Sequence, residues 1–211
     1  MLKYVFAATV SALITTPAVA ADLAGPRVEA RVSYDRISLG MTASDGFTTE
    51  RASGHDNGLG YGAEAGYDAR VGATLVLGAY AGIERSTTKE CGTSGTERLC
   101  ARLGRNITAG GRLGMIASPS VLLYAKGGYS NGRLSVDYRD SAFPGDNFDF
   151  GVNRSGFHVG LGAEGNIGSK GYIKAEYVRT NYRDARYRDG SYSLGLDSHR
   201  DQGVVGFGVR F

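Results

Sequence analysis

The chain has 211 residues with 24 basic and 21 acidic side chains, and it contains 33 Gly, 13 Tyr and only 4 Pro. This length suits one domain, and the near balance of charge gives no support for a nucleic-acid binder, which needs a basic face. Beyond residue 20 no run approaches the ~18 apolar residues of a membrane-spanning helix, which excludes a helical membrane protein. The Gly and Tyr content favours an all-β chain.

The first 20 residues have the layout of a secretory signal peptide. Lys3 precedes an apolar run at residues 5–14, and small residues at positions 18–20 follow. An early cation, an apolar stretch and a small-residue cleavage site are what such a leader requires. We expect cleavage after Ala20, which leaves residues 21–211 as one exported β-barrel domain of 191 residues.

Eight segments of the remaining chain alternate apolar with small, polar or charged residues, the period of a β-strand. In the first, at residues 27–35, Val28, Ala30 and Val32 alternate with Arg27, Glu29 and Arg31. The others follow in chain order at residues 59–68, 75–84, 102–115, 121–130, 157–167, 172–177 and 205–211. Eight is an even number, as a closed antiparallel barrel of a bacterial outer membrane requires.

The connections between these segments alternate in length. Short ones lie near residues 70–72, 118–120 and 168–171, and long polar ones span residues 40–57, 85–98, 137–153 and 183–200. Short periplasmic turns and long external loops are typical of outer-membrane barrels. The pattern predicts an eight-stranded antiparallel up-and-down transmembrane β-barrel with four long extracellular loops.

In hydrocarbon a sheet must close on itself, and its apolar face must point to lipid. The charged face then lines the lumen, with seven bases and six acids: Arg27, Glu29, Arg31, Glu64, Asp68, Glu84, Arg102, Arg112, Lys126, Glu164, Lys174, Glu176 and Arg210. Eight strands leave an interior only wide enough for side chains. We therefore expect a lumen closed by paired charges rather than a conducting pore.

Cys91 and Cys100 are the two cysteines of the chain. In an exported protein their close spacing predicts a disulfide across one loop. The alternative, a metal or redox pair, lacks a second Cys pair or a nearby His. No metal, catalytic residue or cofactor is expected.

Three other features have both a functional and a structural interpretation. His199, beside Ser198 and near Asp201, could belong to a barrel enzyme that trims lipid, but adjacent strand residues point to opposite faces. Residues 179–192 interleave Arg and Tyr and could bind lipopolysaccharide head groups, or they form a solvated loop. Four tyrosines near strand ends are expected to form aromatic girdles at the two membrane interfaces rather than a ligand cage: Tyr34, Tyr61, Tyr67 and Tyr129.

Residues 122–133 (LLYAKGGYSNGR), 172–182 (YIKAEYVRTNY) and 200–211 (RDQGVVGFGVRF) resemble small outer-membrane β-barrels of the OmpA/OmpX type, and more closely the porin-family or opacity-like surface antigens of alphaproteobacteria. The resemblance implies that the barrel assembly machinery reads the terminal strand through Val205, Phe207, Val209 and Phe211. OmpA-type proteins often continue into a peptidoglycan-binding domain, and this chain ends at the last strand, so cell-wall anchoring is not expected.

We expect a structural or surface-interaction barrel of the cell outer membrane that is not an enzyme. Its expected partners are outer-membrane lipid and lipopolysaccharide, the assembly machinery, and host or cell-surface ligands bound by the loops, with no nucleic acid. Alternatives are a narrow small-solute channel, a lipid-modifying barrel enzyme, and a soluble lipocalin-like ligand binder whose apolar face points inward.

Overall fold

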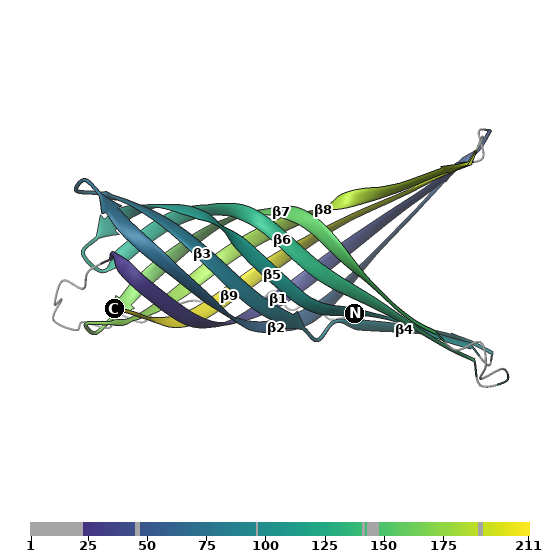
Figure 1. Cartoon of the computed structure of the whole chain (residues 1–211), viewed down its shortest axis with the longest axis horizontal. Coiled ribbons are helices and arrows are strands. Elements are labelled where there is room, and N and C mark those ends of the chain that lie inside the picture. The colour runs from purple at the N-terminus through teal and green to yellow at the C-terminus, as the bar shows by residue number, and fades with distance from the viewer. Residues whose placement is uncertain (1–22, 45–46, 96, 141, 143–147, 190–191) are drawn as a thin grey trace, which may run out of the picture.

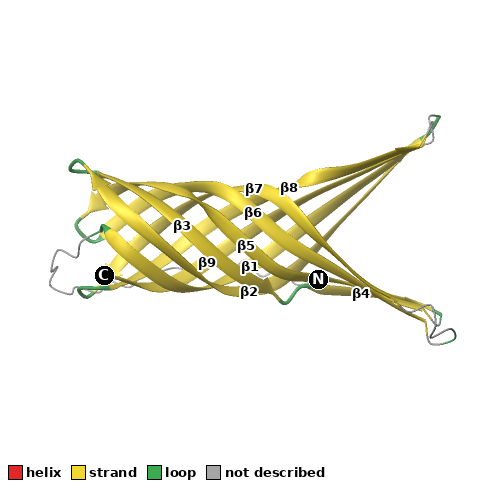
Figure 2. Cartoon of the chain, in the orientation of Figure 1, coloured by secondary structure: helices red, strands yellow, loops and turns green. Residues whose placement is uncertain are grey.

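The computed structural model describes residues 23–44, 47–95, 97–140, 142, 148–189 and 192–211. The predicted signal peptide and its cleavage site lie outside the described residues. None of the described segments forms a helix long and apolar enough to cross a membrane, and Figure 2 shows strands joined by turns.

The described chain forms a single antiparallel sheet. Its strands are β1 (Gly25–Ser44), β2 (Thr49–Val71), β3 (Leu75–Ser86), β4 (Lys89–Ser94), β5 (Glu97–Ser118), β6 (Val121–Asp140), β7 (Phe148–Ile167), β8 (Gly171–Asp189) and β9 (Tyr192–Arg210). β3 and β4 both pair with β5, so they form one strand interrupted at Thr87 and Thr88. The sheet closes because β1 pairs with β9 and β3 with β5. The prediction of an eight-membered up-and-down barrel is confirmed.

Within the barrel, side chains alternate along the strands between buried inward positions and exposed outward ones, and most of the exposed side chains are apolar. Val32 is 60% exposed and Phe207 58%, whereas Arg27 and Glu64 are 1% and 2% exposed. The exposed belt includes Val28, Leu77, Ile83, Ile107, Leu113, Leu123, Val159, Leu161, Ile173 and Val205. A soluble barrel has the reverse arrangement, so the lipocalin-like interpretation is wrong, and the belt is the lipid-facing surface of a membrane barrel.

Short turns connect the strands at one end of the barrel (Figure 1). Gly72 and Gly168 have φ of 73° and 65° in two of these turns, a conformation that other residues rarely adopt. A small apolar cluster of Leu23, Val76 and Leu122, with Ile116 against it, closes the lumen here.

At the other end the strands continue well beyond the belt (Figure 1). β2 stops pairing with β3 at Gly60 and Ser86, and β7 stops pairing with β8 at Gly156 and Tyr182. The sheet therefore divides into two diverging parts. We call these two parts the wings. The first wing comprises the described residues of β1, β2, β8 and β9 within 36–58 and 183–201, and the second wing comprises those of β4 to β7 within 89–103 and 132–155.

The wings correct the expectation of long loops. Most residues of the four polar connections, such as 49–57 and 183–189, lie in strands. β1 pairs with β2 as far as Ser44 and Thr49, and β8 with β9 as far as Asp189 and Tyr192. Ladder pairing satisfies the backbone beyond the membrane even where the side chains are polar on both faces, and for that reason the sequence pattern did not indicate these strands.

Candidate functional site

Charged side chains fill the lumen. Seven bases and seven acids of the described chain are buried: Arg27, Arg31, Arg112, Lys126, Lys174, Arg200 and Arg210, with Glu29, Asp35, Glu64, Asp68, Glu84, Glu164 and Glu176. The structure brings together every predicted lumen charge except Arg102. The strand pattern put Asp35 on the charged face of the first segment, but the predicted set of lumen charges left it out. Arg200 was missed because it falls in a predicted loop.

The sequence pattern predicted that Arg102 faces the lumen, and this prediction is wrong. Its side chain is 53% exposed and pairs with Asp137 at 3.2 Å. Leu103 opposes Leu134 while Asn106 opposes Gly132, so two residues of β5 face one residue of β6. Such a bulge moves the residues before it to the opposite face of the sheet.

Arg112 and Arg210 form the layer above the apolar cluster. Arg112 Nε donates to Asp68 Oδ1 at 2.8 Å and its Nη1 to Glu164 Oε2 at 3.0 Å. Arg210 Nη2 donates to the same two carboxylates. Each base therefore bridges two acids, and each acid accepts from two bases.

Glu64 is the centre of the middle layer. Its carboxylate accepts hydrogen bonds from Arg27 at 3.0 Å, from Arg31 at 2.9 Å and from Lys126 Nζ at 2.9 Å. Lys126 also donates to Glu176 at 3.2 Å. Because all these side chains are buried, removing one partner would leave a charge with no water to replace it.

The outermost layer is built on Arg200, which donates to both Asp35 and Glu84. Gln202 Nε2 donates to the same two carboxylates at 3.0 Å each. This layer lies where the two wings begin, so it closes the lumen toward the outside.

Three tyrosines fill the space between the charges. The Tyr80 ring lies under Lys126 Nζ at 4.2 Å, Tyr124 under Arg112 at 4.9 Å and Tyr172 under Arg210 at 5.2 Å. Each has a glycine opposite it on a neighbouring strand: Gly110, Gly162 and Gly208. A Cβ at Gly162 would lie 2.5 Å from the Tyr124 ring, so these glycines make room for the aromatic side chains.

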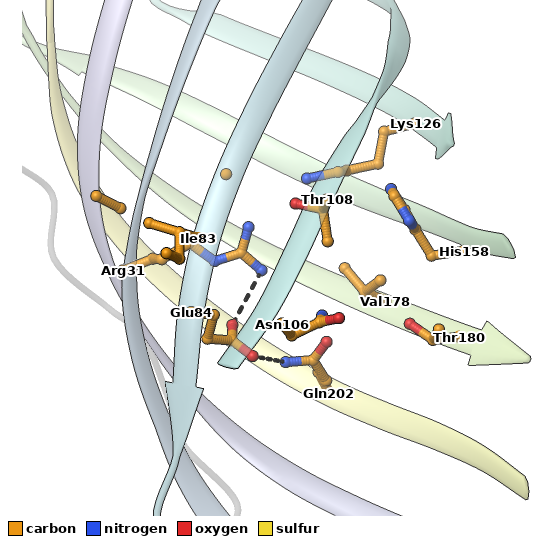
Figure 3. A pocket seen from close by; sticks show the side chains of 12 residues that line it. Arg31, Ile83, Glu84, Asn106, Thr108, Lys126, His158, Val178, Thr180 and Gln202 are labelled. Atoms are coloured by element: carbon orange, nitrogen blue, oxygen red, sulfur yellow. Dashed lines mark hydrogen bonds and ion pairs between the residues drawn. The ribbon is translucent and has the colours of Figure 1, made fainter. Parts of the chain in front are cut away.

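Little space remains inside. A cavity of about 10 Å³ lies among Arg31, Glu84, Lys126, His158 and Gln202, whose side chains are drawn in Figure 3. This is close to the smallest space that holds one water molecule. His158 is hydrogen-bonded to Ser130 Oγ at 2.8 Å through Nδ1 and to the Tyr80 hydroxyl through Nε2. This cavity is too small for a solute larger than water.

A larger cavity of about 330 Å³ lies at the outer mouth, where the wings separate. Ile37, Leu103, Leu134 and Tyr182 contribute apolar surface, and Arg154 and Asp56 contribute charge. The sequence pattern gave no signal for this cavity, because its walls come from residues on all parts of the ring.

Cys91 and Cys100 oppose each other on β4 and β5, and their sulfurs are bonded. The disulfide joins the two strands of one hairpin of the second wing. Among the described residues, no group of three or more His, Cys, Asp or Glu could hold a metal ion.

Ser198 and His199 do not come together, since they are adjacent on β9 and point to opposite faces of the sheet. His199 Nε2 lies 3.9 Å from Asp201 Oδ2. In the Arg and Tyr stretch, Arg179 lies 3.7 Å from Asp201 and Arg183 is exposed. The side chains of Arg186, Tyr187, Arg188 and Tyr192 lie outside the described ones.

Asp149 forms an exposed ion pair on the second wing. Its two carboxylate oxygens accept hydrogen bonds from Arg139 Nη2 at 2.9 and 3.1 Å. Its hydrogen bond with the Asp137 carboxyl and this ion pair hold the pKa of Asp149 below its ordinary value.

The exposed rings of Tyr34, Tyr61, Tyr67 and Tyr129 lie on the outward face, as the girdle prediction requires.

The chain is similar to several solved structures at low sequence identity. Ail, the attachment invasion locus protein of Yersinia pestis, is 12% identical over 90% of this chain and 100% of its own, with a TM-score of 0.44. Neisserial surface protein A is 15% identical over 85% of this chain and 97% of its own, with a TM-score of 0.48. OprG from Pseudomonas aeruginosa is 12% identical over 92% of this chain and 99% of its own, with a TM-score of 0.49. No curated protein matches the chain.

The family assignment rests on the sequence. Residues 6–211 match the family described as the outer membrane protein beta-barrel domain. The match spans every described strand, and the lipid-facing belt and closed sheet agree with it. The chain belongs to the outer membrane protein β-barrel family and resides in the outer membrane.

Proposed function

We propose that this protein is a closed structural and surface-interaction barrel, an opacity-like surface antigen that neither conducts solutes nor catalyses a reaction. The observation that carries the proposal is the filled lumen. Fourteen buried charges with mutual ion pairs leave a cavity of about 10 Å³. Opening a path would separate buried ion pairs, which costs on the order of 3–5 kcal/mol for each stranded charge.

The wings supply the surface for interaction. Within the described residues, β2 and β8 are the edge strands of the first wing, and β4 and β7 are those of the second. An edge strand presents unpaired backbone N–H and C=O groups, onto which an extended segment of another protein can add as a further strand. Extended segments of host or cell-surface proteins are therefore the partners we propose.

Lipid and the assembly machinery are the other proposed partners. Phe207 and Phe211 are 58% and 67% exposed on the outward face, where Val205 is also exposed. This side of β9 is available to lipid after insertion and to the assembly machinery before it.

Planar-bilayer recording of the purified, folded protein tests the closed lumen. We expect no steady ion conductance, because the ion-paired layers block the lumen at several levels. Steady single-channel conductance would favour the narrow channel instead. A porin reconstituted in the same lipid serves as the positive control.

Mass spectra of lipid A from cells with and without the protein test the proposal that the protein does not modify lipid. We expect the same acyl pattern in both, since Ser198 and His199 point to opposite faces. A change that is lost in His199→Ala would establish the lipid-modifying alternative.

A further inference from the structure

The cavity at the outer mouth is a closed-ended pocket. Its volume of about 330 Å³ falls within the range of small-molecule sites. Below it, Arg200, Asp35 and Glu84 close the lumen through direct ion pairs. A solute can therefore enter the pocket from outside and has no path onward, which is the geometry of a binding site and not of a channel entrance.

The apolar wall is built by residues that continue the inward faces of their strands. Ile37 is 8% exposed and follows Asp35 on β1, and Tyr182 follows buried Thr180 on β8. Leu103 and Leu134 oppose each other across β5 and β6. These four side chains come from four strands and converge above the charged layer, so they can surround the apolar body of a ligand.

Arg154 is the distinctive charge of this pocket. It opposes Gly132 across β6 and β7 and lies on the inward face, four residues from buried His158. All seven buried bases of the lumen are ion-paired. Arg154, by contrast, has no carboxylate partner among the described residues, so its guanidinium is available to a ligand.

The rest of the pocket favours an anion. Arg133 also lines it and has no carboxylate partner in the described part of the chain, whereas Arg102 is paired with Asp137. The acid on the wall is Asp56, whose Oδ1 accepts the backbone N–H of Asn57 at 2.8 Å. A planar guanidinium binds a carboxylate through two parallel hydrogen bonds.

Tyr182 adds a hydroxyl next to the apolar wall. A tyrosine hydroxyl keeps its proton at neutral pH. It can therefore donate a hydrogen bond to an anionic or carbonyl oxygen.

We propose that the outer mouth binds a small amphipathic carboxylate, an aromatic or medium-chain aliphatic acid, whose carboxylate pairs with Arg154 and whose apolar body packs on Ile37, Leu103, Leu134 and Tyr182. This goes beyond the surface-interaction function and does not depend on it.

Calorimetric titration of 2-naphthoate into the full protein in lipid nanodiscs tests the proposal, with empty nanodiscs subtracted to remove partitioning into lipid. We expect saturable binding that weakens about 10- to 100-fold in Arg154→Gln, the loss typical of a charge-assisted hydrogen bond. Neutral 2-naphthylmethanol should bind more weakly to the unmodified protein and be insensitive to Arg154→Gln.

Two further variants sharpen the test. Arg183→Gln removes an exposed arginine of the first wing, next to Tyr182 but on the opposite face, and should leave binding unchanged. Gly54→Phe adds a side chain where a Cβ would meet no atom within 4 Å, at the wall of the pocket. It should abolish binding, while the heat-dependent gel mobility of the variant shows that the barrel is folded.

Equal affinity of Arg154→Gln and the unmodified protein would overturn the assignment of the anion site. Undiminished binding to Gly54→Phe would overturn the location. If inorganic phosphate displaced 2-naphthoate at comparable concentration, the site would be a general anion site, and the amphipathic assignment would be wrong.

Discussion

Glu64 shows how much the lumen depends on single residues. It accepts from Arg27, Arg31 and Lys126 while being 2% exposed. Glu64→Gln keeps the shape but leaves three cations without their shared counter-charge. We expect it to lower the free energy of unfolding by about 3–5 kcal/mol, measured by urea unfolding of the refolded protein. Asp149→Asn, at an exposed pair on the second wing, is the matched control and should cause no resolvable change; equal effects would contradict the network.

Gly208 illustrates the packing of tyrosines against glycines. A Cβ at this position would overlap the Tyr172 ring. Gly208→Ala should therefore lower the free energy of unfolding by about 1–3 kcal/mol, the usual cost of overpacking, as measured by urea titration. Gly203→Ala lies on the same strand, where a Cβ would meet no atom within 4 Å, and should have no such effect. Similar losses in both variants would show that the ring can move aside.

At the scale of the element, the hairpin of β4 and β5 depends on a cross-link more than on packing. Cys91 and Cys100 close a short loop, and a bridge of this size contributes roughly 2–3 kcal/mol. We expect reduction to speed proteolysis of the second wing while the barrel keeps its heat-dependent gel mobility, because the bridge lies outside the belt. A Cys91→Ser and Cys100→Ser double variant should be cleaved equally with and without reductant.

The terminal strand β9 closes the ring by pairing with β1 and β8. Deletion of Phe211 removes the last outward aromatic residue of this strand and should reduce the amount of protein at the cell surface more than any single change in the wings. Surface labelling of whole cells measures the effect, and Phe47→Ala, at the tip of the first wing, is the control. Normal surface levels of the truncated protein would refute the assembly-signal assignment.

For the whole molecule, closure predicts a simple physical behaviour. Each strand within the belt pairs with two neighbours, so no unpaired edge faces the membrane. The protein should stay compact in detergent and migrate faster on a gel until it is boiled. The same mobility before and after boiling would mean that the ring is not closed in solution.

Local alternation was sufficient to predict the barrel. The pattern from Arg27 to Arg31, repeated in seven other segments, distinguished the lumen face from the lipid face because side chains on a strand point alternately to its two sides. It identified Glu64, Arg112 and most of the other lumen charges, and the cysteine spacing indicated a disulfide across one hairpin loop. All of these properties depend on residues close together in the chain.

Only the tertiary structure decided how strands combine. Arg102 lies outside because a bulge opposite Arg133 reverses the face of β5, and a bulge depends on pairing with another strand. Arg200 reaches Asp35 and Glu84 across sequence separations of 165 and 116 residues. The division into two wings, and the mouth pocket between them, follow from where neighbouring strands stop pairing. The sequence determined the faces of each strand because alternation is local; the register between strands, and therefore the contacts in the lumen and at its mouth, were decided by closure of the whole ring.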